Sequence, residues 1–117
     1  MNYSVQLLDE VDRDIDELSD FYRDMVDDAS AERFEGAFEE MIKSLGYWSR
    51  SNKMFENDDR VRRRDMASHK VAVIYVIDDE VCEVIAVKAF HFLSDDIALR
   101  KMVDERLELL QERKKTT

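Results

Sequence analysis

The chain has 117 residues, of which 44% are hydrophobic and 39% are charged. A chain of this length builds one hydrophobic core, which excludes a barrel enzyme or a complete dinucleotide-binding domain. Its formal net charge of −10 opposes binding to nucleic acid or anionic membranes by the molecule as a whole, so any such role requires a local cationic patch.

The sequence contains no evident targeting segment or linker. No apolar run approaches the roughly 20 residues that span a bilayer, and the first residues lack the regions of a signal peptide. The single cysteine, Cys82, allows no internal disulfide, and we expect it to be a small buried side chain. With no proline and two glycines, nothing divides the chain. We expect one cytoplasmic domain over residues 1–117, with its core over about 3–92 and no cofactor or metal.

The charge is unevenly distributed along the chain. Residues 1–59 hold 17 acidic and 6 basic residues, whereas residues 60–117 hold 11 acidic and 12 basic residues. The most basic segment, residues 60–70, has five basic residues and one acidic residue. A long acidic region therefore precedes a short cationic patch.

The first half of the chain predicts a strand and two helices. Apolar residues alternate over residues 3–8, as in a half-buried strand. From Asp9 to Met25 the apolar residues are spaced by four and three, which predicts a helix with its acidic residues facing outward. Ser30 is the predicted N-cap of a second helix, whose apolar stripe ends at Trp48. The short connection between the two helices predicts an antiparallel hairpin.

The second half predicts three strands and a helix. Residues 49–59 are polar and aperiodic, so we expect a loop there. Strands are predicted over residues 61–66, 71–77 and 81–90, the last two joined by a tight acidic turn and lying at the centre of an antiparallel sheet. A helix is predicted from about residue 95 to 113. This order indicates an α+β fold in which the helical hairpin covers one sheet face and the other face, or a groove beside it, stays open.

Several segments then carry a family resemblance over about residues 3–96. They are Tyr3-Ser4-Val5-Gln6-Leu7, the arginines at 62–64, Ser68-His69-Lys70 before the strand that contains Tyr75, and Val87-Lys88-Ala89-Phe90-His91. In this order they resemble the RelE/ParE toxin superfamily of bacterial type II toxin-antitoxin modules. The resemblance implies an N-terminal strand, a helical hairpin, a three-stranded antiparallel meander and a C-terminal helix. It also implies a cognate antitoxin as partner.

Candidate site residues follow from the chemistry of RNA cleavage, which needs a base, an acid and cations on the phosphate. If the chain is a ribonuclease, its predicted catalytic residues are Arg64, His69 and His91. The cationic residues predicted to bind a phosphate or a target surface are Lys53, Arg60, Arg62, Arg63, Arg64, Lys70 and Lys88. On a strand, Arg62 and Arg64 share one face and Arg63 lies on the other. An equal alternative is that the arginines pair with acidic residues of their own chain.

The last helix carries the predicted interface with the antitoxin or a second copy of the chain. Its apolar stripe consists of Leu99, Val103, Leu107 and Leu110. If this stripe is exposed, it is large enough to form an interface and a homodimer contact; if the helix folds back over the sheet, the stripe is core. We expect the helix to dock in part.

Three functions remain open from the sequence. The first is a ParE-like toxin that binds a cellular protein, with DNA gyrase as a candidate target. It is favoured because no tyrosine follows His91, where the resemblance implies one in the ribonucleases, and because the net charge is negative. The second is a RelE-like, ribosome-dependent mRNA endoribonuclease. The third is a non-toxic acidic protein that imitates a DNA backbone.

Overall fold

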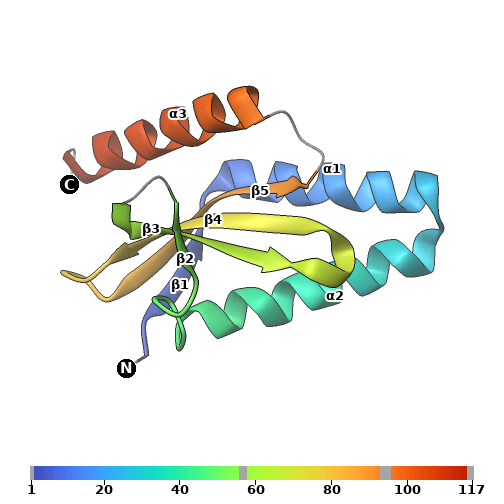
Figure 1. Ribbon diagram of the computed structural model, residues 1–117, viewed down its shortest axis with the longest axis horizontal. Helices are drawn as coiled ribbons and strands as arrows, with labels where there is room; N and C mark the ends of the chain where they lie inside the picture. Colours follow the sequence, from blue (N-terminus) through green and yellow to red (C-terminus); the bar gives the residue numbers. More distant parts are fainter. Residues whose placement is uncertain (1, 56–57, 93–95, 116–117) are drawn as a thin grey trace.

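The computed structural model describes residues 2–55, 58–92 and 96–115. The elements, in chain order, are β1 (Ser4–Leu7), α1 (Asp9–Met25), α2 (Asp28–Leu45), β2 (Lys53–Phe55), β3 (Asp58–Met66), a 3₁₀ turn (Ala67–His69), β4 (Val71–Asp78), β5 (Glu83–His91) and α3 (Asp96–Lys115). The strands form one sheet in the order β1-β5-β4-β3-β2. Figure 1 shows α2 and α3 on opposite sides of this sheet. The predicted α+β fold with its helical hairpin and antiparallel meander is confirmed.

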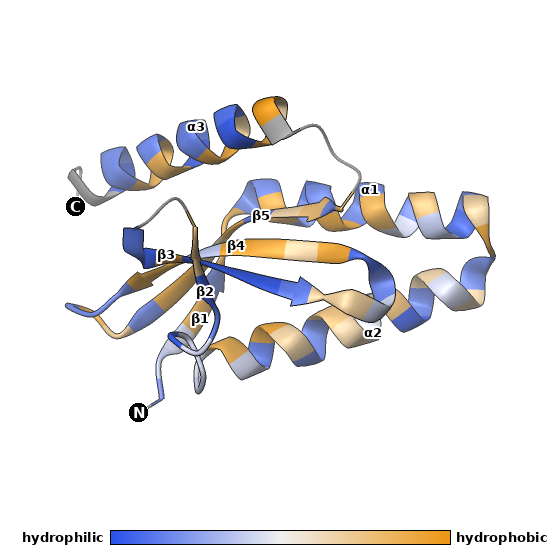
Figure 2. Cartoon of the chain, viewed as in Figure 1, coloured by the Kyte–Doolittle hydropathy of each residue, from blue (hydrophilic) through white to orange (hydrophobic). Residues whose placement is uncertain are grey.

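Strand β4 lies at the centre of the core. Its residues Val71, Val73 and Tyr75 face one side and Ala72 and Ile74 face the other, and all five are fully buried. A strand that is covered on both faces has a nearly continuous apolar sequence, which explains why much of β4 is orange in Figure 2. The neighbouring β3 contains hydrophilic residues, drawn in blue, in the same view.

The short strand β1 forms one edge of the sheet and runs parallel to β5, with Val5 paired to Val84. The end of α2 closes against this edge, where the Tyr3 amide donates to the carbonyl of Gly46. A Cβ atom at position 46 would lie 2.4 Å from the Tyr3 carbonyl oxygen. Glycine is therefore required here by the close approach of two backbone segments.

The helical hairpin forms as predicted, but two details were wrong. The N-cap of α2 is Asp27, whose side chain accepts a 2.7 Å hydrogen bond from the Ser30 amide, so Ser30 already lies inside the first turn. The helix ends at Leu45, and Trp48 is 67% exposed instead of ending a buried stripe. Gly46 and the turn that follows it break the periodicity before Trp48 reaches the core.

The predicted loop over residues 49–59 contains β2 and the start of β3, which pair antiparallel. Strand β2 has three residues and little of it is buried, so although Met54 and Phe55 are apolar, the segment shows no apolar alternation. The last strand was predicted to begin at Val81, but β5 begins two residues later at Glu83, because Val81 and Cys82 lie in the turn before it. Cys82 is only half-buried and has a φ of 53°, contrary to the expected buried strand position.

Helix α3 covers the sheet face that was expected to stay open. Leu99 and Val103 are 5% and 0% exposed, and Leu107 and Leu110 pack against the same core. The predicted start of this helix at residues 94–95 lies outside the described residues. None of the helices among the described residues is long and apolar enough to cross a bilayer.

Candidate functional site

The cationic strand β3 places its arginines as the alternation predicts. Arg62 donates 2.8 Å to the backbone carbonyl of Asn52, and Arg64 donates 3.3 Å to the side-chain oxygen of the same residue. Arg63 faces the other side, where its guanidinium lies 5.2 Å from the ring centre of Phe90. The shared face of Arg62 and Arg64 is the one that also carries Tyr75.

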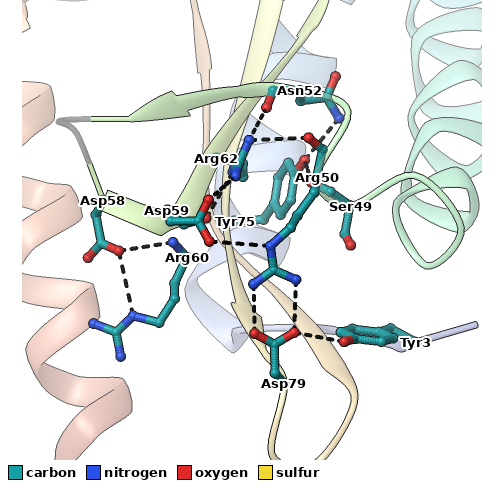
Figure 3. A network of polar contacts seen from close by, with 10 residues as sticks. All are labelled: Tyr3, Ser49, Arg50, Asn52, Asp58, Asp59, Arg60, Arg62, Tyr75 and Asp79. Carbon is teal, nitrogen blue, oxygen red and sulfur yellow. Dashed lines mark hydrogen bonds and ion pairs between the residues drawn. The ribbon is translucent and has the colours of Figure 1, made fainter. Parts of the chain in front are cut away.

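Arg62 is a buried structural residue, with 8% of its surface exposed. Figure 3 shows its guanidinium between the carboxylate of Asp59 and the carbonyl oxygens of Arg50 and Asn52. It also donates 2.9 Å to the Asp59 carbonyl. These hydrogen bonds satisfy a buried charge and fix the segment that joins α2 to β2.

Tyr75, on β4, also holds the segment that joins α2 to β2. Its hydroxyl donates to the carbonyl of Ser49 and accepts a 2.9 Å hydrogen bond from the Asn52 amide. Burial raises the pKa of the Tyr75 phenol, since a phenolate would lose its hydration. Tyr75 is therefore a neutral core residue that holds residues 49–52 in place.

Three further cations of this patch pair with carboxylates on the surface. Arg63 lies 2.7 Å and Lys53 lies 3.7 Å from Asp65, and Arg60 lies 3.5 Å from Asp58. The Arg60 amide donates to Asp58 and lowers the pKa of that carboxyl group. The intramolecular pairing that the sequence left as an alternative is thus present for most of the arginine run.

A second polar network, which the sequence did not predict, lies beside the hydrogen bonds of Arg62 in Figure 3. Arg50 donates two hydrogen bonds to Asp79, of 2.9 and 2.6 Å, and one of 3.3 Å to Asp59. Tyr3 donates 2.7 Å to Asp79. Arg50 and Tyr3 together lower the pKa of Asp79 to about 2. No local pattern signals this network, because its members lie 29 and 76 residues apart along the chain.

Two cations of the predicted patch remain accessible to a binding partner. Arg64 and Lys70 are exposed, and among the residues that the structure describes neither has a carboxylate within ion-pairing distance. Lys70 adopts a left-handed conformation, with a φ of 54°, at the end of the 3₁₀ turn. These two residues are what remains of the predicted cationic surface.

Both histidines pack against aromatic rings of the helical layer. His69 contacts Tyr22 and Phe34, with ring centres 6.0 and 5.8 Å away, and the Tyr22 hydroxyl donates to the His69 carbonyl. His91 lies against Phe21, with ring centres 5.3 Å apart. The structure therefore gives each imidazole a packing role.

Lys88 is not on the surface but forms a buried cluster with Asp14 and Arg106. Its ammonium lies 2.9 Å from Asp14, which is 4% exposed and also binds Arg106 and the Ala89 amide. The ladder between β4 and β5 shifts here, since Ile74 pairs with Lys88 and Tyr75 with Ala86. Arg106 donates a 2.9 Å hydrogen bond to the carbonyl of Val87, the bulged residue of β5 that the register with β4 skips. The cluster ties α1, β5 and α3 together.

Comparisons with known proteins identify the fold. No family model matches the chain, and neither does any curated protein. Among solved structures, the chain resembles one from the chromosomal ParDE toxin-antitoxin system of Pseudomonas aeruginosa, with 13% identity, a TM-score of 0.66 and coverage of 76% of this chain and 95% of that chain. It also resembles a chain of the RelBE2 toxin-antitoxin complex of Mycobacterium tuberculosis, with 19% identity, a TM-score of 0.59 and coverage of 78% and 92%.

A third similar structure is a mutant of the Escherichia coli toxin RelE in the free state, with 12% identity, a TM-score of 0.50 and coverage of 92% of this chain and 97% of that chain. The same mutant in complex with a peptide of its antitoxin is also matched, with a TM-score of 0.51. The chain therefore has the RelE/ParE toxin fold, as the sequence resemblance indicated.

Proposed function

We propose that the chain is the toxin of a bacterial type II toxin-antitoxin module, that it inhibits growth in the cytoplasm by binding a cellular protein, and that a cognate antitoxin neutralises it. The observation that carries this proposal is the fold, which covers 95% of the ParDE chain and 92% of the RelBE2 chain. Both of those structures come from toxin-antitoxin systems, and the fold extends over nearly the whole of each matched chain.

The geometry of the cationic strand favours binding over RNA cleavage. Cleavage requires an acid, a base and cations that converge on one phosphate. Here Arg62 is committed to backbone carbonyls, Tyr75 is buried with a raised pKa, and His69 and His91 pack against rings of the helical layer. Arg64 is exposed on that face and, among the described residues, has no carboxylate within ion-pairing distance. A single cation of this kind is suited to bind a partner surface but does not supply the several groups that cleavage requires.

DNA gyrase is the first candidate target to test. The toxin expressed from an inducible promoter in a bacterial host should stop growth, and coexpression of the neighbouring reading frame should restore it. Gyrase stalled on DNA, with transcripts intact, is the expected result. Unaffected growth contradicts the toxin proposal and favours the acidic DNA-mimic alternative.

Substitutions separate the two toxin mechanisms. Arg64→Ala is expected to weaken growth inhibition, because it removes an exposed cation from the contact surface, whereas His91→Ala should leave it largely intact. Specific cuts in transcripts that disappear in both variants would replace the binding mechanism with a ribonuclease. Arg60→Ala is the matched control, since Arg60 is exposed on the same strand but already paired with Asp58.

A further inference from the structure

The helical hairpin holds almost all of the net charge of the molecule. Helices α1 and α2 contain thirteen acidic and four basic residues, a net charge of −9 against −10 for the whole chain. Two of the four basic side chains bind acidic residues of the hairpin, Arg23 with Asp20 and Asp28 and Lys43 with Glu40. Most of the hairpin carboxylates therefore have no ion-pair partner among the residues that the structure describes.

Some of these carboxylates surround a groove between the two helices. The groove has a volume of about 580 Å³ and opens where α1 and α2 meet the edge strand β1. Its rim carries five exposed carboxylates, Asp12, Asp16, Glu32, Glu35 and Glu39. None of the described residues that line it is a lysine or an arginine.

The floor of the groove is apolar, which distinguishes it from an acidic surface that water covers. Leu7 contributes a side chain that is 39% exposed, beside Ile15 and Phe38. At Gly36 on α2, an added Cβ atom would meet nothing within 4 Å, so the groove stays open on that side. Apolar surface below a ring of carboxylates fits a chain segment that has both apolar and cationic side chains.

The edge strand adds a second feature that suits a bound chain. Ser4 and Leu8 donate to Cys82 and Ala86 across the parallel ladder. The alternation of a strand then directs the N–H and C=O groups of Val5 and Leu7 away from β5. The groove therefore lies beside an edge whose backbone groups face outward.

We propose that this groove binds a cationic amphipathic segment of the antitoxin, with lysine or arginine side chains at the five carboxylates and an apolar side chain on Leu7. The identity of the partner rests on the proposed function, whereas its chemistry rests on the groove. Lysine and arginine compensate carboxylates that would otherwise repel one another, and the apolar anchor displaces water from the floor. Nucleic acid is excluded from the groove by charge.

Three purified variants test the charge and the shape of the groove separately. The triple variant Asp16→Asn, Glu35→Gln, Glu39→Gln removes three rim carboxylates. Its matched control is Asp24→Asn, Glu40→Gln, Glu108→Gln, which gives the same net charge with exposed residues outside the groove. Gly36→Met fills the groove with a strong helix former, and Gly36→Ala is its small counterpart. Thermal melting confirms that each variant is folded.

The first probe is a labelled helical peptide of lysine and leucine with one apolar stripe, and its scrambled isomer of the same composition. Wild type and the control variant should bind the striped peptide with similar affinity, while the groove variant and Gly36→Met should each bind about tenfold more weakly. Equal weakening in the groove and control variants, or equal binding of the scrambled peptide, means non-specific electrostatic attraction and overturns the proposal.

The second probe is the full-length antitoxin identified by growth rescue. The groove variant and Gly36→Met should bind it about tenfold more weakly than wild type, and the control variant and Gly36→Ala should bind it as wild type does. Unchanged antitoxin binding in the groove variants overturns the inference while growth rescue leaves the proposed function intact. If the chain is not toxic, the proposed function fails, and the peptide measurements still report on the groove.

Discussion

The helical hairpin and strand β3 are both densely charged, but they use their charges differently. On β3, Arg60 and Arg63 bind aspartates two residues away, and Arg62 is buried among carbonyl groups. On the rim of the groove, carboxylates such as Glu35 and Glu39 face solvent, and the described residues that line the groove include no lysine or arginine. The local partners of a charge, and not its sign or number, decide which surface is free to bind.

This contrast reverses the emphasis that the sequence suggests. The arginine run stands out against an acidic chain, yet most of it contributes to the structure of the sheet. The acidic helices look like an ordinary solvated face, yet they enclose a groove with an apolar floor. A binding surface is therefore identified by uncompensated charge next to exposed apolar area.

Asp14 is the exception within the acidic hairpin, and its substitution should have the largest effect. Asp14→Ala leaves Lys88 and Arg106 buried without a counter-charge, which should lower the free energy of unfolding by about 3–5 kcal/mol. Urea denaturation measures this change. Asp16→Ala, two residues further along α1 and exposed, should change it by less than about 0.5 kcal/mol.

A second variant distinguishes the lost ion pairs from lost packing. In the double variant Asp14→Leu, Lys88→Met, apolar side chains replace one of the buried pairs, so part of the stability should return. If Asp14→Ala is as stable as Asp16→Ala, the cluster does not hold α3 on the sheet.

Within β3, two arginines on the same face should differ sharply. Arg62→Met should destabilise the fold by about 2–3 kcal/mol, because it removes the side-chain donor of three backbone carbonyls and leaves Asp59 with Arg50 as its remaining guanidinium partner among the described residues. Arg64→Met should cost less than about 0.5 kcal/mol, since Arg64 is exposed and makes one long hydrogen bond to Asn52. Thermal and urea unfolding of both variants measure the difference, and equal effects would contradict the division of roles.

Local periodicity was sufficient to predict the helices and the central strands. The spacing of apolar residues in α1 and the β-branched run of β4 reflect burial that each element imposes on its own sequence. Strand β2 was missed because an exposed edge strand imposes no such pattern. The Asp14 cluster and the Arg50–Asp79 pair depend on contacts between distant residues, 74 and 29 positions apart, so no sequence spacing reveals them.

The two glycines should respond to alanine with opposite signs. Gly46→Ala should destabilise the fold by about 1–3 kcal/mol, because its methyl group would meet the Tyr3 carbonyl oxygen at 2.4 Å. Gly36→Ala should stabilise it by about 0.5–1 kcal/mol, since the added methyl group meets nothing and alanine favours the helix. Differential scanning calorimetry measures both, and a destabilising Gly36→Ala would show that the groove is not open at this position.

The smallest expected effect concerns Asp79, which joins the segment after α2 to the β4–β5 turn through Arg50. The folded pKa of this carboxyl group is about 2, below the value of about 3.9 for an unfolded aspartate. The ionised pair therefore stabilises the fold above about pH 4, and this contribution disappears as the pH falls toward 2. Wild type should lose more stability than Asp79→Asn over that interval, as measured by urea denaturation at each pH.

Two further variants test which partner of Asp79 matters more. Arg50→Met should flatten the pH profile of stability in the same way as Asp79→Asn, whereas Tyr3→Phe should flatten it less, because Arg50 supplies the larger part of the pKa shift of Asp79. Because Asp79 is exposed, added salt should narrow the difference between wild type and Asp79→Asn. Parallel pH profiles for these two proteins at low salt would mean that the Arg50–Asp79 pair does not form in solution.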